Sequence, residues 1–266
     1  MPREPLYPRS KTPSRRGGCA VIKVENVCKS HLGRPVLRNI SFEVNEGLNL
    51  GLIGPGGCGK TVLLKIICGL IRPDSGKVFI NDVDVMSLKE TEIAELRKSL
   101  GMLFQNYALF DDMTVSENIA FPLRQAGEAS EEEIQELVKG LLVEIGLPTA
   151  AQKFPNELSG GMKKRVSFAR AVIHKPPILF YDDPTAGLDP VTSSKIFRLL
   201  TQMKDDQGTT SITVSHDIDG IKDICENFLM LDRGQIVFHG SREEIEETDI
   251  KLVRQFWDAS SDDELG

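Results

Sequence analysis

Apolar residues recur at two different spacings along this chain, and segments with the two spacings alternate over much of its length. Short apolar runs and every-second-residue patterns are typical of β-strands, whereas longer segments with one apolar face are typical of α-helices. The expected strands are residues 19–27, 40–44, 48–54, 76–82, 101–105, 177–183, 209–217 and 228–240. The expected helices that alternate with them are residues 61–70, 87–100 and 193–205. This order predicts an α/β fold with a mostly parallel sheet covered by helices on both faces.

The alternation stops between about residues 106 and 176, where a helical pattern takes over. Within 130–147, the apolar residues that share one helical face are Ile134, Leu137, Leu141, Leu142 and Ile145. Ser130 and Glu133 have the spacing of a capping box, which predicts that a helix begins there. We therefore expect an α-helical subdomain inserted into the α/β domain at about 106–176.

The two ends of the chain differ from the rest in composition. Residues 1–18 are rich in proline, serine and basic residues, and residues 258–266 are acidic and small. Neither segment carries an apolar period, so we expect a disordered basic tail and a mobile acidic tail. Residues 19–240 between them are expected to form the main domain.

A short helical extension is expected over residues 241–257. Ser241 and Glu244 form a second capping-box pattern at its start, and the single tryptophan, Trp257, lies at its end. A second subunit or an accessory protein are alternative partners for this segment, but we favour packing on its own domain.

Composition and charge narrow the class of protein. The chain has 266 residues, 40% of them hydrophobic, which is enough for one large domain with an insertion. Its formal net charge of −7 disfavours a general nucleic-acid binder. Neither a run of about 18 apolar residues nor an apolar signal core is found, so we expect a cytoplasmic chain that does not span a membrane. Five cysteines without C-x-x-C spacing indicate reduced thiols.

The segment GPGGCGKT fits the phosphate-loop pattern G-x-x-x-x-G-K-[ST] and lies between an expected strand and an expected helix. Glycines let the backbone curl so that its N–H groups point at phosphate, and the following helix presents its positive end. Lys60 can reach the β- and γ-phosphates, and the Thr61 hydroxyl can bind Mg²⁺. The expected phosphate-binding residues are Gly54, Pro55, Gly56, Gly57, Cys58, Gly59, Lys60, Thr61 and, through its backbone N–H only, Val62. The helix end is also expected to lower the pKa of Cys58, although we interpret this residue as a small tolerated one rather than a redox switch.

The apolar run ILFY ends in two adjacent carboxylates, Asp182 and Asp183. A buried strand that ends in Asp182 can hold Mg²⁺ opposite Thr61, directly or through water. Asp183 would then lie beyond the metal, near the γ-phosphate, where it can orient a water for attack. One acid is thus expected to serve the metal and the other the water.

The segment LSGGM, followed by KKRVSFARA and then by ILFYDD, resembles the nucleotide-binding subunit of ABC transporters over about residues 21–240. This resemblance implies a P-loop NTPase of the ABC type that binds and hydrolyses ATP with Mg²⁺. Gln105 resembles the glutamine that reaches the metal and the γ-phosphate site. His216 resembles the switch histidine that senses the γ-phosphate.

The same resemblance assigns residues that act across an interface. Ser159, Gly160 and Gly161 match the signature sequence, which in this family binds the ATP held by the other subunit. Residues 187–189 match the D-loop, which crosses the dimer interface. One phosphate loop and one signature per chain imply a dimer that sandwiches two ATP molecules, most simply a homodimer.

Two positions depart from the family pattern. Family members often stack an aromatic residue on adenine, and the matching position here is His31, whose imidazole stacks less extensively. The family usually has Glu at the position of Asp183. The shorter side chain implies either a slower base or a protein that mainly binds ATP.

Residues 103–124, together with LSGGMKKR and the late VRQFWD, resemble the ATPases of Mla-type phospholipid transport, which work with Mce-domain proteins. This resemblance implies a membrane-embedded permease that docks around residues 106–113, an Mce-domain partner, and a position on the inner face of the bacterial inner membrane. Two alternatives remain: the ATPase of another importer, for example for amino acids, and a soluble regulatory ABC ATPase without a permease.

Overall fold

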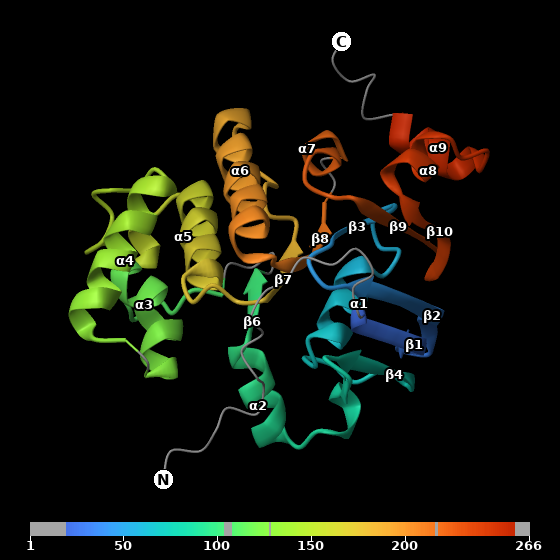
Figure 1. Ribbon diagram of the computed structural model, residues 1–266, viewed down its shortest axis with the longest axis horizontal. Coiled ribbons are helices and arrows are strands. Elements are labelled where there is room, and N and C mark those ends of the chain that lie inside the picture. Colours follow the sequence, from blue (N-terminus) through green and yellow to red (C-terminus); the bar gives the residue numbers. More distant parts are fainter. Residues whose placement is uncertain (1–19, 104–107, 128, 216–217, 259–266) are drawn as a thin grey trace.

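A six-stranded sheet forms the centre of the molecule (Figure 1). The computed structural model describes residues 20–103, 108–127, 129–215 and 218–258. The strand order is β10-β9-β3-β8-β7-β6, and all neighbours are parallel except β9 and β10. The strands are β3 (Asn49–Ile53), β6 (Leu100–Leu103), β7 (Ile178–Asp182), β8 (Thr210–Val214), β9 (Asn227–Asp232) and β10 (Gln235–Ser241). The expected α/β fold with a mostly parallel sheet is confirmed.

The N-terminal strands form a second sheet, which the sequence pattern did not separate from the first. Its order is β2-β1-β4-β5 and all of its pairs are antiparallel. Its strands are β1 (Ala20–His31), β2 (Arg34–Asn45), β4 (Ser75–Ile80) and β5 (Val83–Asp84). Leu32 and Gly33 join β1 to β2, both with positive φ (48° and 75°), as a two-residue hairpin turn requires. So short a connection permits only antiparallel pairing.

Alternating side chains of the central strands divide the interior into two cores. Ile178 and Phe180 of β7 belong to a core shared with the antiparallel sheet and the helix at residues 60–67. Leu179 and Tyr181 belong to a second core, which is shared with the helices between residues 115 and 172. The central strands therefore read as continuous apolar runs, because both faces of the sheet are covered.

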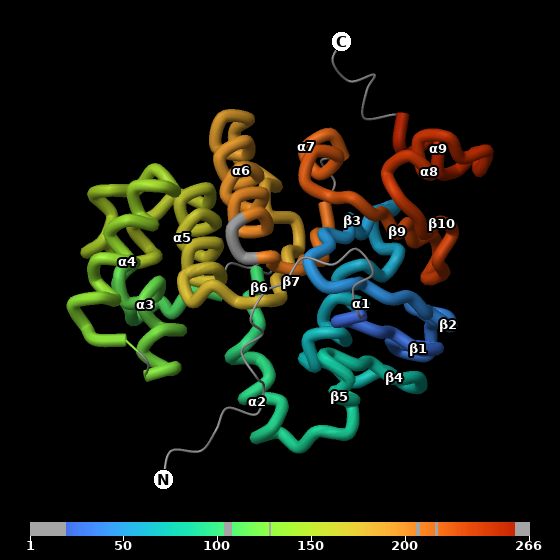
Figure 2. Tube along the Cα trace, in the orientation of Figure 1, coloured from blue at the N-terminus to red at the C-terminus, as the bar shows by residue number. Residues whose placement is uncertain are grey.

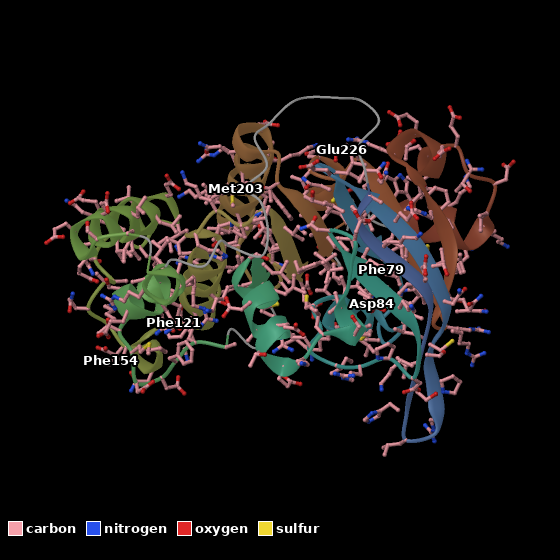
Figure 3. All side chains as sticks on the ribbon, turned by 60° about the horizontal axis from the view of Figure 1, so that its bottom comes forward. Phe79, Asp84, Phe121, Phe154, Met203 and Glu226 are labelled. Atoms are coloured by element: carbon pink, nitrogen blue, oxygen red, sulfur yellow. The ribbon has the colours of Figure 1, made fainter. Side chains whose placement is uncertain are left out.

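Helices cover the sheet and build one end of the molecule. Helices α3, α4 and α5 lie together beside β6, at the left of Figure 1, and their buried side chains join one core cluster. The longer helices are α1 (Lys60–Ile67), α2 (Glu90–Lys98), α3 (Val115–Ala126), α4 (Glu131–Glu144), α5 (Gly160–Val172) and α6 (Pro190–Gln207). The expected capping box of Ser130 and Glu133 is present at the start of α4. Figure 3 shows Phe121 and Phe154 in this helical part, on the opposite side of the molecule from Phe79 and Asp84 of the antiparallel sheet. That this part forms a separate subdomain at about 106–176 stays a prediction.

The C-terminal extension packs on its own domain, as expected. Its helices are α8 (Arg242–Glu246), which begins with the expected capping box, and α9 (Lys251–Asp258). They lie beside β10 and near α7 (Ile218–Lys222) in the tube view (Figure 2). The Trp257 ring is 5% exposed and meets the Phe228 ring edge-on, at 4.8 Å between centroids. The Lys222 ammonium lies 4.7 Å from the centroid of the same indole. Within the described residues, no helix is both long and apolar enough to cross a membrane.

Replacing Trp257 by alanine should lower the free energy of unfolding by about 3 kcal/mol, because it removes a large buried side chain and leaves a cavity beside Phe228. Urea unfolding followed by circular dichroism would measure the change. Leu252→Ala, on the same helix but 38% exposed, is the control and should cost less than about 1 kcal/mol. Equal losses for the two variants would contradict the packing role of Trp257.

Candidate active site

The phosphate-loop pattern forms the connection between β3 and α1 at the carboxyl end of a central strand. Gly54 and Gly59 have φ values of 138° and 112°, which side-chain-bearing residues rarely adopt. A Cβ atom on Gly59 would lie 2.7 Å from Cδ2 of Leu37, and one on Gly54 would clash with the Leu231 carbonyl. Glycine is therefore required at both ends of the loop, which brings β2 and β9 close to it.

The Lys60 ammonium is held by the loop itself. Its side chain is 5% exposed and donates to the carbonyl oxygens of Gly54 at 2.6 Å and Pro55 at 2.9 Å. A buried ammonium needs acceptors of this kind, and anionic phosphate oxygens would be stronger ones. The structure thus fixes one positive charge within the loop, at the start of α1, where the helix also favours an anion.

The side chains of Cys58 in the loop and Val62 in α1 pack toward the core. The Sγ atom of Cys58 lies 3.8 Å from the Lys60 ammonium. Burial raises the pKa of the Cys58 thiol, and the neighbouring Lys60 charge offsets this only in part. The expectation that the helix end would lower this pKa is wrong, because desolvation of the thiolate outweighs the positive charges. Val62 packs against the core, so only its backbone can serve a ligand.

The fold brings Thr61 and Asp182 into contact, although they lie 121 positions apart in the chain. The Thr61 hydroxyl donates to Oδ1 of Asp182 at 3.1 Å. Asp182 is 1% exposed, and its Oδ2 atom has no hydrogen-bond partner among the described residues. Burial raises the pKa of this carboxyl and the Thr61 hydrogen bond opposes that rise. A buried carboxylate oxygen without a partner, next to a hydroxyl, suits a hard cation such as Mg²⁺, so the residues fit the expected metal.

Asp183 occupies an unusual backbone conformation. Its φ is 63°, in the left-handed region where Asp and Asn are the best tolerated residues other than glycine. Its N–H donates to the Val214 carbonyl at 2.8 Å, which continues the pairing of β7 with β8 by one residue. The side chain is buried, with 6% exposure of the residue. This conformation gives a physical reason for the shorter acid at this position.

The signature segment forms the start of α5. The Ser159 hydroxyl caps the helix by accepting from the Met162 N–H at 3.3 Å, and the first turn contains no acidic residue. Ser159 and Gly160 are exposed. A Cβ on Gly161 would lie 3.3 Å from Cδ2 of Leu188. The signature of this chain therefore lies beside its own D-loop, and its Ser159 and Gly160 remain accessible to another molecule.

The D-loop leads directly into α6. Asp189 is exposed and caps that helix, accepting from the Thr192 N–H at 3.0 Å and from the Thr192 hydroxyl at 2.7 Å. These hydrogen bonds lower the pKa of the Asp189 carboxyl. The loop is thus anchored at its end by a helix cap while it remains at the surface.

The roles expected of three further site residues are not tested by the structure. His31 is exposed at the end of β1 and pairs with Arg34 across the hairpin turn; its role in stacking on adenine stays a prediction. Gln105 and His216 lie outside the described residues. Their assignments also stay predictions.

Lys164 was missed by the sequence reasoning. It is 5% exposed, and its ammonium donates to the Ala186 carbonyl at 2.7 Å. The signal was present in the sequence, because helical spacing places Lys164 on the same face as Phe168 and Ala171, which are buried.

Comparison with known proteins agrees with this geometry. The family profile described as "ABC transporter" matches residues 37–186. The phospholipid transport ATP-binding protein MlaF of Haemophilus influenzae is 34% identical over 91% of this chain and 92% of its own. The methionine import ATP-binding protein MetN of Carboxydothermus hydrogenoformans is 40% identical over 76% of this chain, but this chain spans only 60% of it. The probable ribonucleotide transport ATP-binding protein mkl of Mycobacterium tuberculosis is 36% identical over 94% of this chain and 69% of its own.

Solved structures are similar over most of the chain. The dimeric ATP-binding cassette MJ0796 in a post-hydrolysis state, bound to ADP and phosphate, superposes with a TM-score of 0.78 and 32% identity. The similarity covers 83% of this chain and 98% of that one.

Proposed function

The chain belongs to the ABC transporter family, and from this premise we propose that it is the ATP-hydrolysing subunit of a transporter that moves phospholipid. The observation that carries the ATPase role is the convergence of Lys60, Thr61 and Asp182 at the phosphate loop. ATP binding and ATP hydrolysis follow from family membership. The cargo, the partners and the roles of individual residues are the proposed part.

The site residues divide the work of hydrolysis. The loop N–H groups and the Lys60 ammonium would bind the phosphates, while the Thr61 hydroxyl and the Asp182 carboxylate would hold Mg²⁺. When bound, this ion supplies positive charge that neutralises the β- and γ-phosphate oxygens. Asp183 accepts a hydrogen bond from the attacking water and orients it. Gln105 and His216 complete the surroundings of the γ-phosphate.

A homodimer would complete each ATP site by adding the signature of a second chain to the phosphate loop of the first. Each chain has one phosphate loop and one signature, and the exposed start of α5 is free to meet ATP bound to a second copy. The structurally similar cassette MJ0796 is dimeric. Two ATP molecules would then lie in the interface, and their hydrolysis would reopen it.

The phospholipid cargo is supported by the length over which this chain aligns with MlaF. The match to MlaF extends over 91% of this chain and 92% of that protein, so both chains correspond almost from end to end. An amino-acid importer is the second candidate, because MetN has the higher identity of 40%, although over less of its length. As the ATPase of a phospholipid transporter, the chain acts with a permease and an Mce-domain protein on the inner face of the bacterial inner membrane.

Purification of the tagged full-length chain from native membranes would test the cargo. We expect a permease, an Mce-domain protein and extractable phospholipid in the purified complex, identified by mass spectrometry. An untagged strain provides the control. A solute-binding protein in place of the Mce-domain protein would favour the amino-acid importer. Recovery of the chain without any membrane partner would favour a regulatory ATPase.

The surface proposed to meet the permease is a loop fixed from within by one buried amide. Asn118 is fully buried. Its Oδ1 accepts from the Phe110 N–H at 2.9 Å, and its Nδ2 donates to the carbonyls of Phe110, Met113 and Thr114 at 3.0–3.1 Å. Residues 110–114 therefore have a set conformation before any partner arrives.

The same loop presents an aromatic side chain at the surface. Phe110 is 38% exposed and packs on Phe121, with ring centroids 4.8 Å apart. The Arg170 guanidinium lies 5.5 Å from the Phe110 ring and donates to the Ala108 carbonyl at 2.7 Å. An exposed aromatic residue on a preorganised loop is a suitable anchor for a partner helix.

Asn118→Ala should uncouple the ATPase from its permease. The change removes the side-chain partner of the Phe110 N–H and of the Met113 carbonyl, whereas the carbonyls of Phe110 and Thr114 keep backbone N–H donors. Each unsatisfied group costs about 1–3 kcal/mol, which loosens the loop. We expect recovery of the permease with the tagged chain to fall at least about tenfold. ATP hydrolysis by the isolated chain should change less than about twofold, since the hydrogen bonds of this loop to Asn118 do not involve the phosphate loop at 54–61. Lys139→Ala, at an exposed position of α4, is the control, and parental permease recovery with Asn118→Ala would refute the role of this loop.

A further inference from the structure

The buried Lys164 ammonium has no role in the hydrolysis scheme above. It lies in the second turn of α5, just after the signature, and its side chain is almost fully buried. Burial lowers the pKa of this ammonium, whereas the negative charges of Asp183 and Asp182 act in the opposite direction. A buried cation is costly unless it is paired and hydrogen-bonded.

The hydrogen bond of this ammonium connects α5 to the segment that follows β7 and Asp183. Lys164 donates to the Ala186 carbonyl at 2.7 Å, and the Ala186 N–H points back to the Asp183 carbonyl at 3.4 Å. A second turn follows, in which the Leu188 N–H donates to the Thr185 carbonyl at 3.0 Å. The segment after Asp183 is therefore a compact pair of turns with Lys164 attached to its middle.

The start of α5 contacts the same turns at a second point. Gly161 of the signature lies against the Leu188 side chain. Together, the Gly161 contact and the Lys164 hydrogen bond join the signature helix to both halves of the segment between Asp183 and Asp189. Because Asp183 serves the ATP of its own chain and the signature serves the ATP of the partner, this junction links the two sites.

We propose that Lys164 is a positioning residue of the ATPase: its ammonium holds the Ala186 carbonyl and so fixes the signature helix relative to the turn that carries Asp183. This inference rests on the proposed roles of Asp183 and the signature. Lys164 does not touch nucleotide in this scheme. Its loss should therefore slow turnover without weakening the binding of ATP to the phosphate loop.

The test compares three substitutions of Lys164 in the full-length chain. Lys164→Met keeps an unbranched apolar side chain of similar length but removes the donor and the charge. Lys164→Arg keeps both, and Lys164→Gln keeps a shorter neutral donor. Lys163→Met, the neighbouring and less buried lysine of the same helix, is the matched control. For each variant we would measure kcat and KM for ATP hydrolysis, the affinity for a fluorescent ATP analogue, and the thermal midpoint.

Lys164→Met is expected to lower kcat by about 10- to 100-fold, as loss of a group that orients a catalytic residue commonly does, with KM and nucleotide affinity within about twofold. Lys164→Arg should recover most of the rate, and Lys163→Met should match the parent. Should Lys164→Met fail to fold, Lys164→Gln should show an intermediate kcat at unchanged affinity. The proposal is overturned if Lys164→Met turns over within twofold of the parent, or if the Arg and Met variants are equally slow.

A further variant separates this inference from the function on which it rests. If Asp183→Asn is inactive and Lys164→Met is fully active, only the role of Lys164 is wrong. If Asp183→Asn hydrolyses ATP at the parental rate, the proposed role of Asp183 itself fails.

Discussion

Replacing Asp183 by asparagine is expected to stop steady-state ATP hydrolysis while ATP continues to bind. The asparagine amide keeps the size of the side chain and suits the left-handed conformation at φ 63°, so the backbone should not change. It cannot accept a proton from the attacking water, and general-base assistance contributes about 10²- to 10⁴-fold to rate. Release of phosphate should therefore fall at least about 100-fold, and ATP should hold the chain as a dimer in size-exclusion chromatography.

Asp183→Glu is the matched control, because it retains a carboxylate and changes only its reach and its fit to the backbone. If the acid itself is what hydrolysis needs, this variant should keep a rate within about tenfold of the parent. An Asp183→Asn chain that released phosphate at the parental rate would rule out Asp183 as the base. A variant that lost ATP binding as well would indicate that Asp183 holds the loop rather than the water.

The phosphate loop and the acidic end of β7 were predictable because their chemistry depends on neighbours in the sequence. A glycine-rich loop between a strand and a helix has few other uses, and a buried strand that ends in two acids meets that loop whenever both strands belong to one parallel sheet. The contact of Thr61 with Asp182 at 3.1 Å is the result. Capping boxes at Ser130 and Ser241 were predictable for the same reason, since they span only four residues.

The pairing of strands and the effects of burial could not be predicted from residues that are neighbours in the sequence. Apolar alternation identifies strands, but it does not tell which strands pair, so the antiparallel sheet of β1, β2, β4 and β5 was not separated from the central one. The pKa of Cys58 depends on how far the thiol is desolvated, which only the packed loop determines. Asp183 likewise has a left-handed backbone and a hydrogen bond to Val214 on a strand distant in the sequence, and neither follows from its neighbours in the chain.

Lys60→Ala should abolish productive ATP binding, because it removes an ammonium that the loop holds in place. Lys60 is 5% exposed and its ammonium is already positioned by the Gly54 and Pro55 carbonyls, so ATP binding gains its charge without ordering a flexible side chain. Removing two charge-assisted hydrogen bonds to phosphate, each worth about 1.5–3 kcal/mol, should weaken ATP binding at least about 100-fold.

Titration with a fluorescent ATP analogue would measure the affinity of the Lys60→Ala chain. Lys98→Ala, whose side chain is 49% exposed at the end of α2, is the control and should bind as the parent does. An affinity within about threefold of the parent would mean that the loop N–H groups and the start of α1 bind the phosphates without the ammonium. In that case the hydrogen bonds of Lys60 to the loop carbonyls would serve the conformation of the loop, and the variant should unfold at lower temperature. Unchanged stability combined with lost affinity therefore distinguishes a phosphate-binding lysine from a structural one.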